Sequence, residues 1–288
     1  MNWGKVNMGP TEMENVGYLL ASMEKGGIYN PYLQAAILGV IGKESGFIPQ
    51  EERCYNNTSL ERIREIFSSK LSGYTDSEVQ ALKQNCVEFF NIVYGGKYGN
   101  GPNEGYKYRG RGFNQITFKA NYRSIGAVIG ENLVSNPDLL LRPDVAADAS
   151  VAFFNRQFRK SAVKNYVASG NPNDVTDLDT AIELAAHANA GFGKNRTSSS
   201  VVRAIGNTAP IADVALAQYI GVPPAGADPT QSPTLLPPIQ YAGVTLDSNK
   251  QLLLLGAAVI FIGIGILGIR RTKKAPVGAS VVYSDSFQ

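Results

Sequence analysis

Histidine and cysteine are scarce in this chain of 288 residues, which has one histidine and two cysteines. Cys54 and Cys86 do not form a CxxC pair, and together with His187 they do not make up a ligand set for zinc. We therefore expect no metal site. The two cysteines could pair once with each other, but two buried free thiols are the favoured expectation. His187 is interpreted as structural.

Dense runs of basic residues are also missing, although the formal net charge is +3. No Lys/Arg block is dense enough to follow a phosphate backbone, so we expect no nucleic-acid partner. A slightly basic chain is compatible with an acidic polymer as its partner. The N-terminus lacks a basic segment followed by an unbroken apolar stretch, so we expect no cleavable secretory signal.

The composition is sufficient for a real core, since 44% of the residues are hydrophobic and 18% are charged. Residues 1–221 are typical of a globular domain of helices and long loops. Residues 222–250 are rich in proline, small and polar residues, which favours an extended linker. An apolar segment (251–270) and a short basic, then polar tail (271–288) complete the chain.

The apolar segment predicts one membrane-spanning helix over residues 252–269. These 18 residues carry no charge, and at about 1.5 Å per residue they would span roughly 27 Å, close to the thickness of a hydrocarbon core. Arg270 and Arg271 follow at once, where lipid head groups would lie. A buried core helix is the alternative, but the polar linker separates this segment from the globular domain. We expect a single-pass C-terminal anchor in a lipid bilayer.

The globular zone is predicted to be mainly α. Apolar residues recur at helical spacing, whereas period-2 alternation is scarce. The predicted helices cover residues 31–43, 59–71, 75–94, 144–158, 180–189 and 211–220.

The first of these helices leads to Glu44. Positions 33, 37, 40, 41 and 44 share one face, and all but the last are apolar. A carboxylic acid at the end of an apolar face is partly removed from water, as a general acid requires. The alternative is an ordinary exposed glutamate at a helix C-terminus.

Glu51 and Glu52 follow Glu44 after a short loop. Two carboxyl groups on opposite sides of a cleft are the minimum for hydrolysis of a glycosidic bond. The loop at residues 47–50 can separate them by the ~6.5–9.5 Å that admits a water molecule in an inverting mechanism.

Two further segments combine glycines with amides and aromatic or basic residues. In residues 106–122 tyrosines, arginines, glycines and amides alternate, which suits sugar rings and their hydroxyl groups. An RNA-binding stretch of the RGG type is the alternative. In residues 188–194 Asn189 could present its amide to a substrate, or the glycines could simply end a helix.

Together these segments resemble glycoside hydrolase family 19, and within it the phage and bacterial endolysins related to class I chitinases. The matching motifs are KESGF at 43–47, EERCYNNT at 51–58, YRGRGFNQITFKANY at 108–122, SNPDLL at 135–140 and ANAGFG at 188–193. The YRGRG motif is the specific one. The resemblance covers roughly residues 30–200 and implies a lysozyme-like helical fold.

The resemblance implies roles for individual residues. Glu44 resembles the general acid, Glu52 the base that activates water, and Thr58 a residue that holds this water. One glycine of the family motif is missing after Ser45, so Glu51 is the alternative base. The third motif reads ANAG where the family has INGG. The positions that match substrate-binding residues are Tyr108, Arg109, Arg111, Gln115, Asn121, Tyr122 and Asn189.

The implied activity is inverting hydrolysis of the β-1,4 bond of peptidoglycan without a cofactor. With the predicted anchor, it suggests a phage lysin held in the internal membrane of a virion or in the host inner membrane, among virion or membrane protein partners. A chitinase is the alternative enzyme. A wall-binding structural membrane protein without activity is the alternative from another class.

Overall fold

The computed structural model describes residues 2–3, 6–192, 198–220, 240–241 and 244–245. The described chain is mainly helical, which confirms the predicted class. Its helices are α1 (Pro10–Lys25), α2 (Pro31–Ser45), α3 (Leu60–Ile66), α4 (Ser68–Leu71), α5 (Asp76–Leu82), α6 (Cys86–Tyr94), α7 (Lys119–Ile129), α8 (Pro143–Phe158), α9 (Leu178–Asn189) and α10 (Ser199–Ala215).

The described strands are only two residues long and form three antiparallel pairs. They are β1 (Asn2–Trp3) with β2 (Val6–Asn7), β3 (Gln50–Glu51) with β4 (Arg111–Gly112), and β5 (Gln240–Tyr241) with β6 (Val244–Thr245). Short helical turns, η1 (Pro137–Leu141), η2 (Ser161–Asn165), η3 (Pro172–Asp174) and η4 (Leu216–Ile220), complete the described elements.

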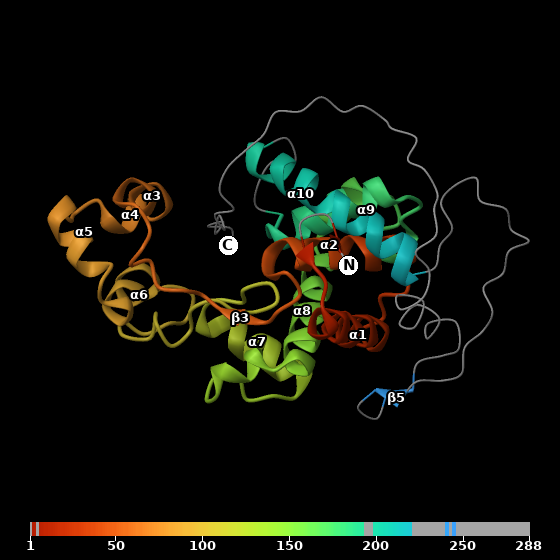
Figure 1. Cartoon of the computed structure of the whole chain (residues 1–288), viewed down its shortest axis with the longest axis horizontal. Coiled ribbons are helices and arrows are strands. Elements are labelled where there is room, and N and C mark those ends of the chain that lie inside the picture. The colour runs from red at the N-terminus through yellow and green to blue at the C-terminus, as the bar shows by residue number, and fades with distance from the viewer. Residues whose placement is uncertain (1, 4–5, 193–197, 221–239, 242–243, 246–288) are drawn as a thin grey trace, which may run out of the picture.

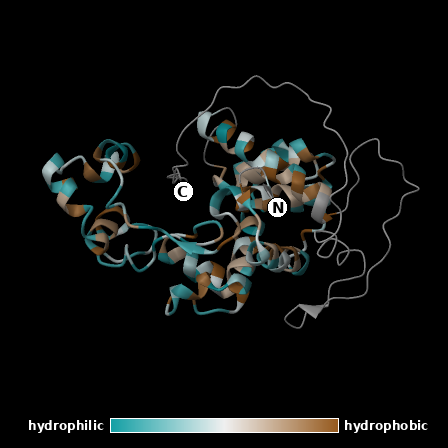
Figure 2. Ribbon diagram, viewed as in Figure 1, coloured by the Kyte–Doolittle hydropathy of each residue, from teal (hydrophilic) through white to brown (hydrophobic). Residues whose placement is uncertain are grey.

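The helices are arranged in two lobes. Figure 1 shows α3–α6 set apart from the larger group of α1, α2 and α7–α10, with β3 in the connection between them. Each lobe has its own hydrophobic core. Figure 2 shows hydrophobic residues on the helices of both lobes and a more hydrophilic connection. The connection therefore brings polar side chains to the junction of two apolar cores.

Helix α2 is the central rod of the larger lobe. It packs against α9 and α10, and α1 packs against α8. A methyl group added at Gly39 would lie 2.8 Å from the Thr208 side chain of α10, so glycine permits this close approach. The helix is buried on most sides, although the sequence indicated a single apolar face. Dense packing around α2 gives its last turn, which carries Glu44, a fixed position.

Two predicted helices are each divided in the structure. The segment 59–71 forms α3 and α4, with Phe67 between them. The segment 75–94 forms α5 and α6, because Asn85 leaves the helical conformation and its side chain caps α6 by accepting from the Glu88 backbone N–H. Propensity alone did not reveal these interruptions.

Among the remaining helices, two were missed by the prediction, one begins earlier than predicted and three agree with it. Helices α1 and α7 were not predicted. Helix α10 begins at Ser199 instead of residue 211 and contains Pro210. It tolerates the proline because packing against α2 and α9 holds it in place. The predicted helices 31–43, 144–158 and 180–189 correspond closely to α2, α8 and α9.

The expectation of two buried free thiols is wrong. Cys54 and Cys86 form a disulfide, with their Cα atoms 5.4 Å apart. Cys54 is exposed and Cys86 is partly exposed. The spacing of the two cysteines did not reveal the pair, because the turn that brings them together depends on the fold of the smaller lobe.

No helix in the described part of the chain is long and apolar enough to cross a membrane. The predicted spanning segment 252–269 and the tail 271–288 lie outside the described residues. Strands β5 and β6 lie within the segment predicted as a linker, residues 222–250.

Candidate active site

The end of α2 is held by the N-terminal segment. Gly46 and Phe47 both have positive φ angles, +60° and +63°, which turn the chain sharply after the helix. Phe47 is fully buried with its ring edge against Trp3, at 5.4 Å between centroids. Its carbonyl accepts a hydrogen bond of 2.8 Å from Asn15 Nδ2 of α1. These contacts fix the turn that directly follows Glu44.

Glu44 lies in the last turn of α2 and contacts two donors. Lys43 Nζ donates to its Oε1 at 2.5 Å, and Asn189 Nδ2 donates to the same oxygen at 3.2 Å. The Glu44 side chain is 13% exposed and that of Lys43 is 28% exposed. The structure therefore brings two of the predicted site residues, Glu44 and Asn189, into direct contact.

A turn after α9 supports Asn189. The Phe192 N–H donates to the His187 carbonyl at 3.0 Å, and Lys160 Nζ donates to the Gly191 carbonyl at 2.8 Å. His187 is buried, and its Nδ1 lies 2.5 Å from the Tyr166 hydroxyl. This burial agrees with a structural role for His187.

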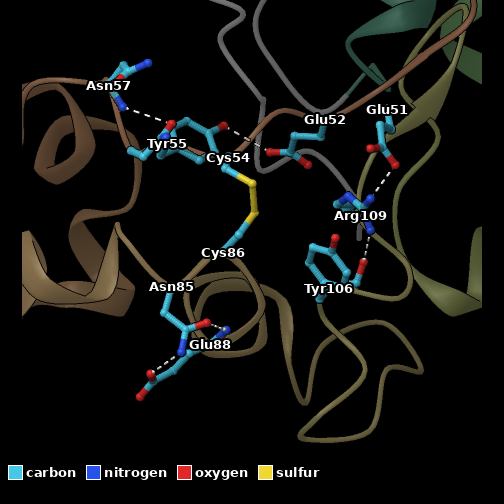
Figure 3. Close-up of a disulfide and its surroundings, with 11 residues drawn as sticks. Glu51, Glu52, Cys54, Tyr55, Asn57, Asn85, Cys86, Glu88, Tyr106 and Arg109 are labelled. Atoms are coloured by element: carbon cyan, nitrogen blue, oxygen red, sulfur yellow. Dashed lines mark hydrogen bonds and ion pairs between the residues drawn. A yellow bond between two sulfur atoms is a disulfide. The ribbon is translucent and has the colours of Figure 1, made fainter.

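Glu51, the last residue of β3, and Glu52, which directly follows the strand, lie on different sides of the chain. In the β3–β4 pair Glu51 lies opposite Arg111, and consecutive side chains of an extended segment point in opposite directions. Figure 3 shows Glu51 directed to Arg109 and Glu52 directed to Tyr55. The two candidate bases thus have separate environments.

Glu51 forms an ion pair with Arg109. Its side chain is 48% exposed, whereas that of Arg109 is 6% exposed. The Arg109 guanidinium lies 3.9 Å from the centre of the Tyr106 ring and donates to the Tyr106 carbonyl at 2.8 Å. Glu51 therefore balances the charge of Arg109, whose guanidinium is held in place by Tyr106.

Glu52 is buried and surrounded by donors. Its Oε1 accepts from the Tyr55 hydroxyl at 3.0 Å and the Tyr94 hydroxyl at 2.9 Å, and its Oε2 accepts from the Gly110 N–H at 3.1 Å. Burial raises the pKa of Glu52 to about 7, although the three hydrogen bonds and nearby Arg109 act to lower it. Glu52 is thus a carboxyl group that changes charge near neutral pH.

The residues of the YRGRG motif are buried and form hydrogen bonds within the protein. The Tyr122 hydroxyl donates to the Arg109 carbonyl at 2.7 Å and accepts from Arg111 Nη1 at 3.1 Å. Arg111 Nε pairs with Asp138 at 2.9 Å, and the buried Tyr108 donates to the Val134 carbonyl at 3.0 Å. These predicted substrate-binding residues hold the backbone that carries Gly110.

Gln115 also supports the connection between the lobes. It has a positive φ of +55°, and its Nε2 donates to the Gln50 carbonyl of β3 at 2.9 Å. Asn121 donates to the Thr117 carbonyl at 2.7 Å and accepts from Arg156 Nη1 at 3.0 Å. Both predicted site residues are thus held by contacts within the larger lobe and the connection.

Thr58 lies in the smaller lobe, three residues beyond Tyr55. Its N–H donates to the Tyr55 carbonyl at 2.9 Å, and its own carbonyl accepts from Lys83 Nζ at 2.5 Å. Its predicted role in holding a water molecule stays a prediction.

The sequence did not single out four groups around the two carboxyls. Lys43 and Tyr55 belong to the same sequence motifs as Glu44 and Glu52, so the sequence could have indicated them. Tyr94 lies in none of the motifs, and although Gly110 belongs to YRGRG, only the fold shows that both contact Glu52. Within the described ranges, no group of three or more His, Cys, Asp or Glu side chains could hold a metal ion.

Comparison with known proteins finds a family match for the central segment. Residues 92–193 match the family model described as Chitinase class I. A "Glycosyl hydrolase family 19 domain-containing protein" of Haemophilus influenzae is 32% identical over 134 residues, which are 43% of this chain and 65% of that protein.

Plant relatives align over a shorter part of the chain. Endochitinase 3 of Nicotiana tabacum is 36% identical over 96 residues, covering 31% of this chain and 25% of the relative. The acidic 27 kDa endochitinase of Solanum lycopersicum is 35% identical over 100 residues, covering 32% and 36%. The chain thus spans less than two thirds of each of these relatives.

The family match includes the YRGRG motif and Asn189, whereas Glu44 and Glu52 precede it in the chain. Both glutamates nevertheless contact residues of the matched segment, Glu44 through Asn189 and Glu52 through Tyr94 and Gly110. The matched segment and the two carboxyls therefore belong to one folded unit, and residues 92–193 within it are similar to the class I chitinases of glycoside hydrolase family 19.

Proposed function

We propose that this chain hydrolyses the β-1,4 glycosidic bonds of peptidoglycan by an inverting mechanism with two carboxyl groups. The observation that carries the proposal is the contrast between Glu44 and Glu52. Glu44 stands at a partly exposed helix end beside Lys43, whereas Glu52 is buried among three donors. Two carboxyls in unlike environments are the basis for separate acid and base roles.

Glu52 is the proposed base. Each of its three hydrogen-bond partners donates to it, and such partners favour the ionised carboxylate. A base near its pKa at neutral pH can take a proton from a water molecule and release it again. Glu51 serves as the counter-charge of Arg109, which leaves Glu52 as the carboxylate available for proton transfer.

Glu44 is the proposed general acid. In its protonated form it donates its proton to the glycosidic oxygen, while water deprotonated by Glu52 attacks the anomeric carbon from the opposite face. The bond from this carbon to the leaving oxygen breaks as the bond to the water oxygen forms, so the product has the inverted anomer. Asn189 orients the Glu44 carboxyl through its amide.

Lys43 favours peptidoglycan over chitin as the substrate. Peptidoglycan carries carboxylates on its stem peptides and on lactyl groups that bear no peptide, whereas chitin is uncharged. The Lys43 ammonium is partly exposed beside the acid, and it can exchange Glu44 for a substrate carboxylate. This exchange would also release Glu44 from its ion pair with Lys43.

Replacing Lys43 with methionine tests this choice of substrate. We expect kcat/KM on purified sacculi to fall about tenfold relative to kcat/KM on chitin oligomers, because one charge-assisted contact is lost. Lys25→Met is the matched control, since Lys25 forms an exposed ion pair with Asp148 away from the site. Equal losses on both substrates would argue against recognition of an anionic glycan.

Chitin is the second candidate substrate, supported by the plant relatives whose names describe them as chitinases and endochitinases. Parallel assays of the unmodified chain on sacculi and chitin oligomers distinguish the two. A higher kcat/KM on sacculi supports peptidoglycan as the substrate. Turnover of chitin alone would show that chitin is the substrate instead.

We further propose a membrane-held phage protein that degrades the host wall, either in the virion or during lysis. The support is the uncharged segment 252–269 and the basic residues after it. Flotation of the full chain with lipid vesicles tests the anchor. The same chain without residues 252–288 should stay at the bottom of the gradient, and flotation of both would exclude this segment as the anchor.

A further inference from the structure

We propose that the Cys54–Cys86 disulfide is a redox switch of the catalytic base: it holds Glu52 in its working position when closed and releases it when reduced. The proposal rests on the function proposed above. Its basis is the position of the two cysteines, each of which lies on an element that supplies a hydroxyl donor to Glu52.

The disulfide joins the segment after β3 to the start of α6. Cys54 is two residues beyond Glu52 and directly precedes Tyr55, while Cys86 is the first residue of the helix that ends at Tyr94. The two tyrosine hydroxyls converge on the same oxygen, Glu52 Oε1. Figure 3 shows the disulfide immediately beside Tyr55 and Glu52. A single covalent link therefore fixes both donors relative to one carboxylate.

Aromatic contacts also join Tyr55 to helix α6. The Tyr55 ring lies 5.3 Å from Phe89 and 6.0 Å from Phe90, between ring centroids. Phe90 in turn stacks on Tyr94 at 5.7 Å. This packing requires the segment 53–55 to stay against α6. Opening the disulfide removes its covalent tether, so water can reach the Glu52 carboxyl.

The third donor is independent of the disulfide. The Gly110 N–H belongs to the segment before β4, and the Glu52 N–H donates back to the Gly110 carbonyl at 2.7 Å. The backbone of Glu52 therefore stays in place when the disulfide opens, and the change is confined to the side-chain environment. We expect reduction to impair the base without unfolding the larger lobe.

The disulfide is accessible to thiols because Cys54 is exposed. A dithiol reductant opens it by exchange: the reductant becomes a disulfide, and Cys54 and Cys86 gain two electrons and two protons. An external disulfide such as oxidised glutathione reverses the reaction. The chain would thus be weakly active in a reducing cytoplasm and fully active in an oxidising compartment where a cell wall is present.

The test compares the full chain in oxidised form, after dithiothreitol, and as the Cys54→Ser/Cys86→Ser double variant. We expect reduction to lower kcat/KM about tenfold to a hundredfold, because a misplaced catalytic group costs up to about 10²-fold. Oxidised glutathione should restore it. The double variant should resemble the reduced chain and be insensitive to dithiothreitol. Circular dichroism should show that the helices persist.

The charge of Glu52 provides a readout that does not require turnover. Titration of its carboxyl carbon by NMR, assigned with Glu52→Gln, should show the pKa falling when the disulfide is reduced, because burial is the main cause of its elevation. Tyr94→Phe should shift it upward, because a hydroxyl that favours the carboxylate is lost. The titratable or charged groups around Glu52 are Tyr55, Tyr94, Tyr122 and Arg109.

The two readouts separate this proposal from the proposed function. If the oxidised chain cleaves no glycan but the Glu52 pKa responds to reduction, the function fails and the effect on Glu52 stands. If a chain with fully reduced thiols keeps its kcat/KM and its Glu52 pKa, the disulfide does not control the base and the proposal is overturned.

Discussion

Replacing Glu44 with glutamine is expected to lower kcat/KM on peptidoglycan by about 10²–10⁴-fold, the range for loss of a general acid. The glutamine oxygen can still accept from Lys43 and Asn189, so the end of α2 keeps its contacts. The free energy of unfolding should therefore change little. Rates of sacculus digestion, with denaturant unfolding in parallel, measure both effects.

Glu65→Gln is the matched control for this change. Glu65 is exposed and pairs with Arg62 on the surface of the smaller lobe, where such a pair contributes about 1 kcal/mol or less. Activity of this variant should equal that of the unmodified chain. Wall lysis by Glu44→Gln at the normal rate would refute the role of Glu44 and favour a wall-binding protein without catalysis.

The second large effect concerns Glu52→Gln, which should abolish activity and stabilise the protein at alkaline pH. The pKa of Glu52 is about 7 in the folded protein and 4.5 in its ordinary state. This difference corresponds to about 3 kcal/mol. The protonated carboxyl stabilises the fold fully below about pH 4.5, and this contribution is lost as the pH rises through about 7. An uncharged glutamine avoids the loss.

Urea unfolding of Glu52→Gln and the unmodified chain at pH 4.5, 6 and 8 measures this effect. The advantage of the variant should be small at pH 4.5 and approach about 3 kcal/mol at pH 8. In the unmodified chain, kcat/KM should rise as the pH increases through about 7, because the base must be ionised. A stability difference that does not change with pH would show that Glu52 is not the buried titrating group.

Regular apolar spacing predicted the elements that carry Glu44 and Asn189. The runs that became α2, α8 and α9 are long and continuous, so the sequence located them well. The smaller lobe was harder, because its helices are short and their interruptions depend on local caps such as Asn85. Its disulfide could not be deduced from two cysteines that are 32 residues apart.

The sequence motifs predicted the main residues of the candidate site, but they did not reveal all of the contacts around them. The motifs located both glutamates and Asn189, but not the hydroxyl of Tyr94, which comes from the far end of α6. The sequence also predicted Arg111 and Tyr122 as substrate-binding residues. The structure gives both side chains internal hydrogen bonds, and their contact with a substrate stays a prediction. A motif contains residues that support a site as well as residues that perform its chemistry. The contacts seen in the structure help to distinguish these two groups.

The anomer of the first product tests the central claim most directly. Proton NMR of sacculi during digestion by the full chain reports which bond is cut and the configuration of the new reducing end before it equilibrates. An inverting two-carboxylate mechanism acting on β-1,4 bonds predicts that the α-anomer of a disaccharide-peptide product forms first. Initial formation of the β-anomer would require a covalent glycosyl-enzyme intermediate or an equivalent double displacement, and would contradict the roles assigned to Glu44 and Glu52.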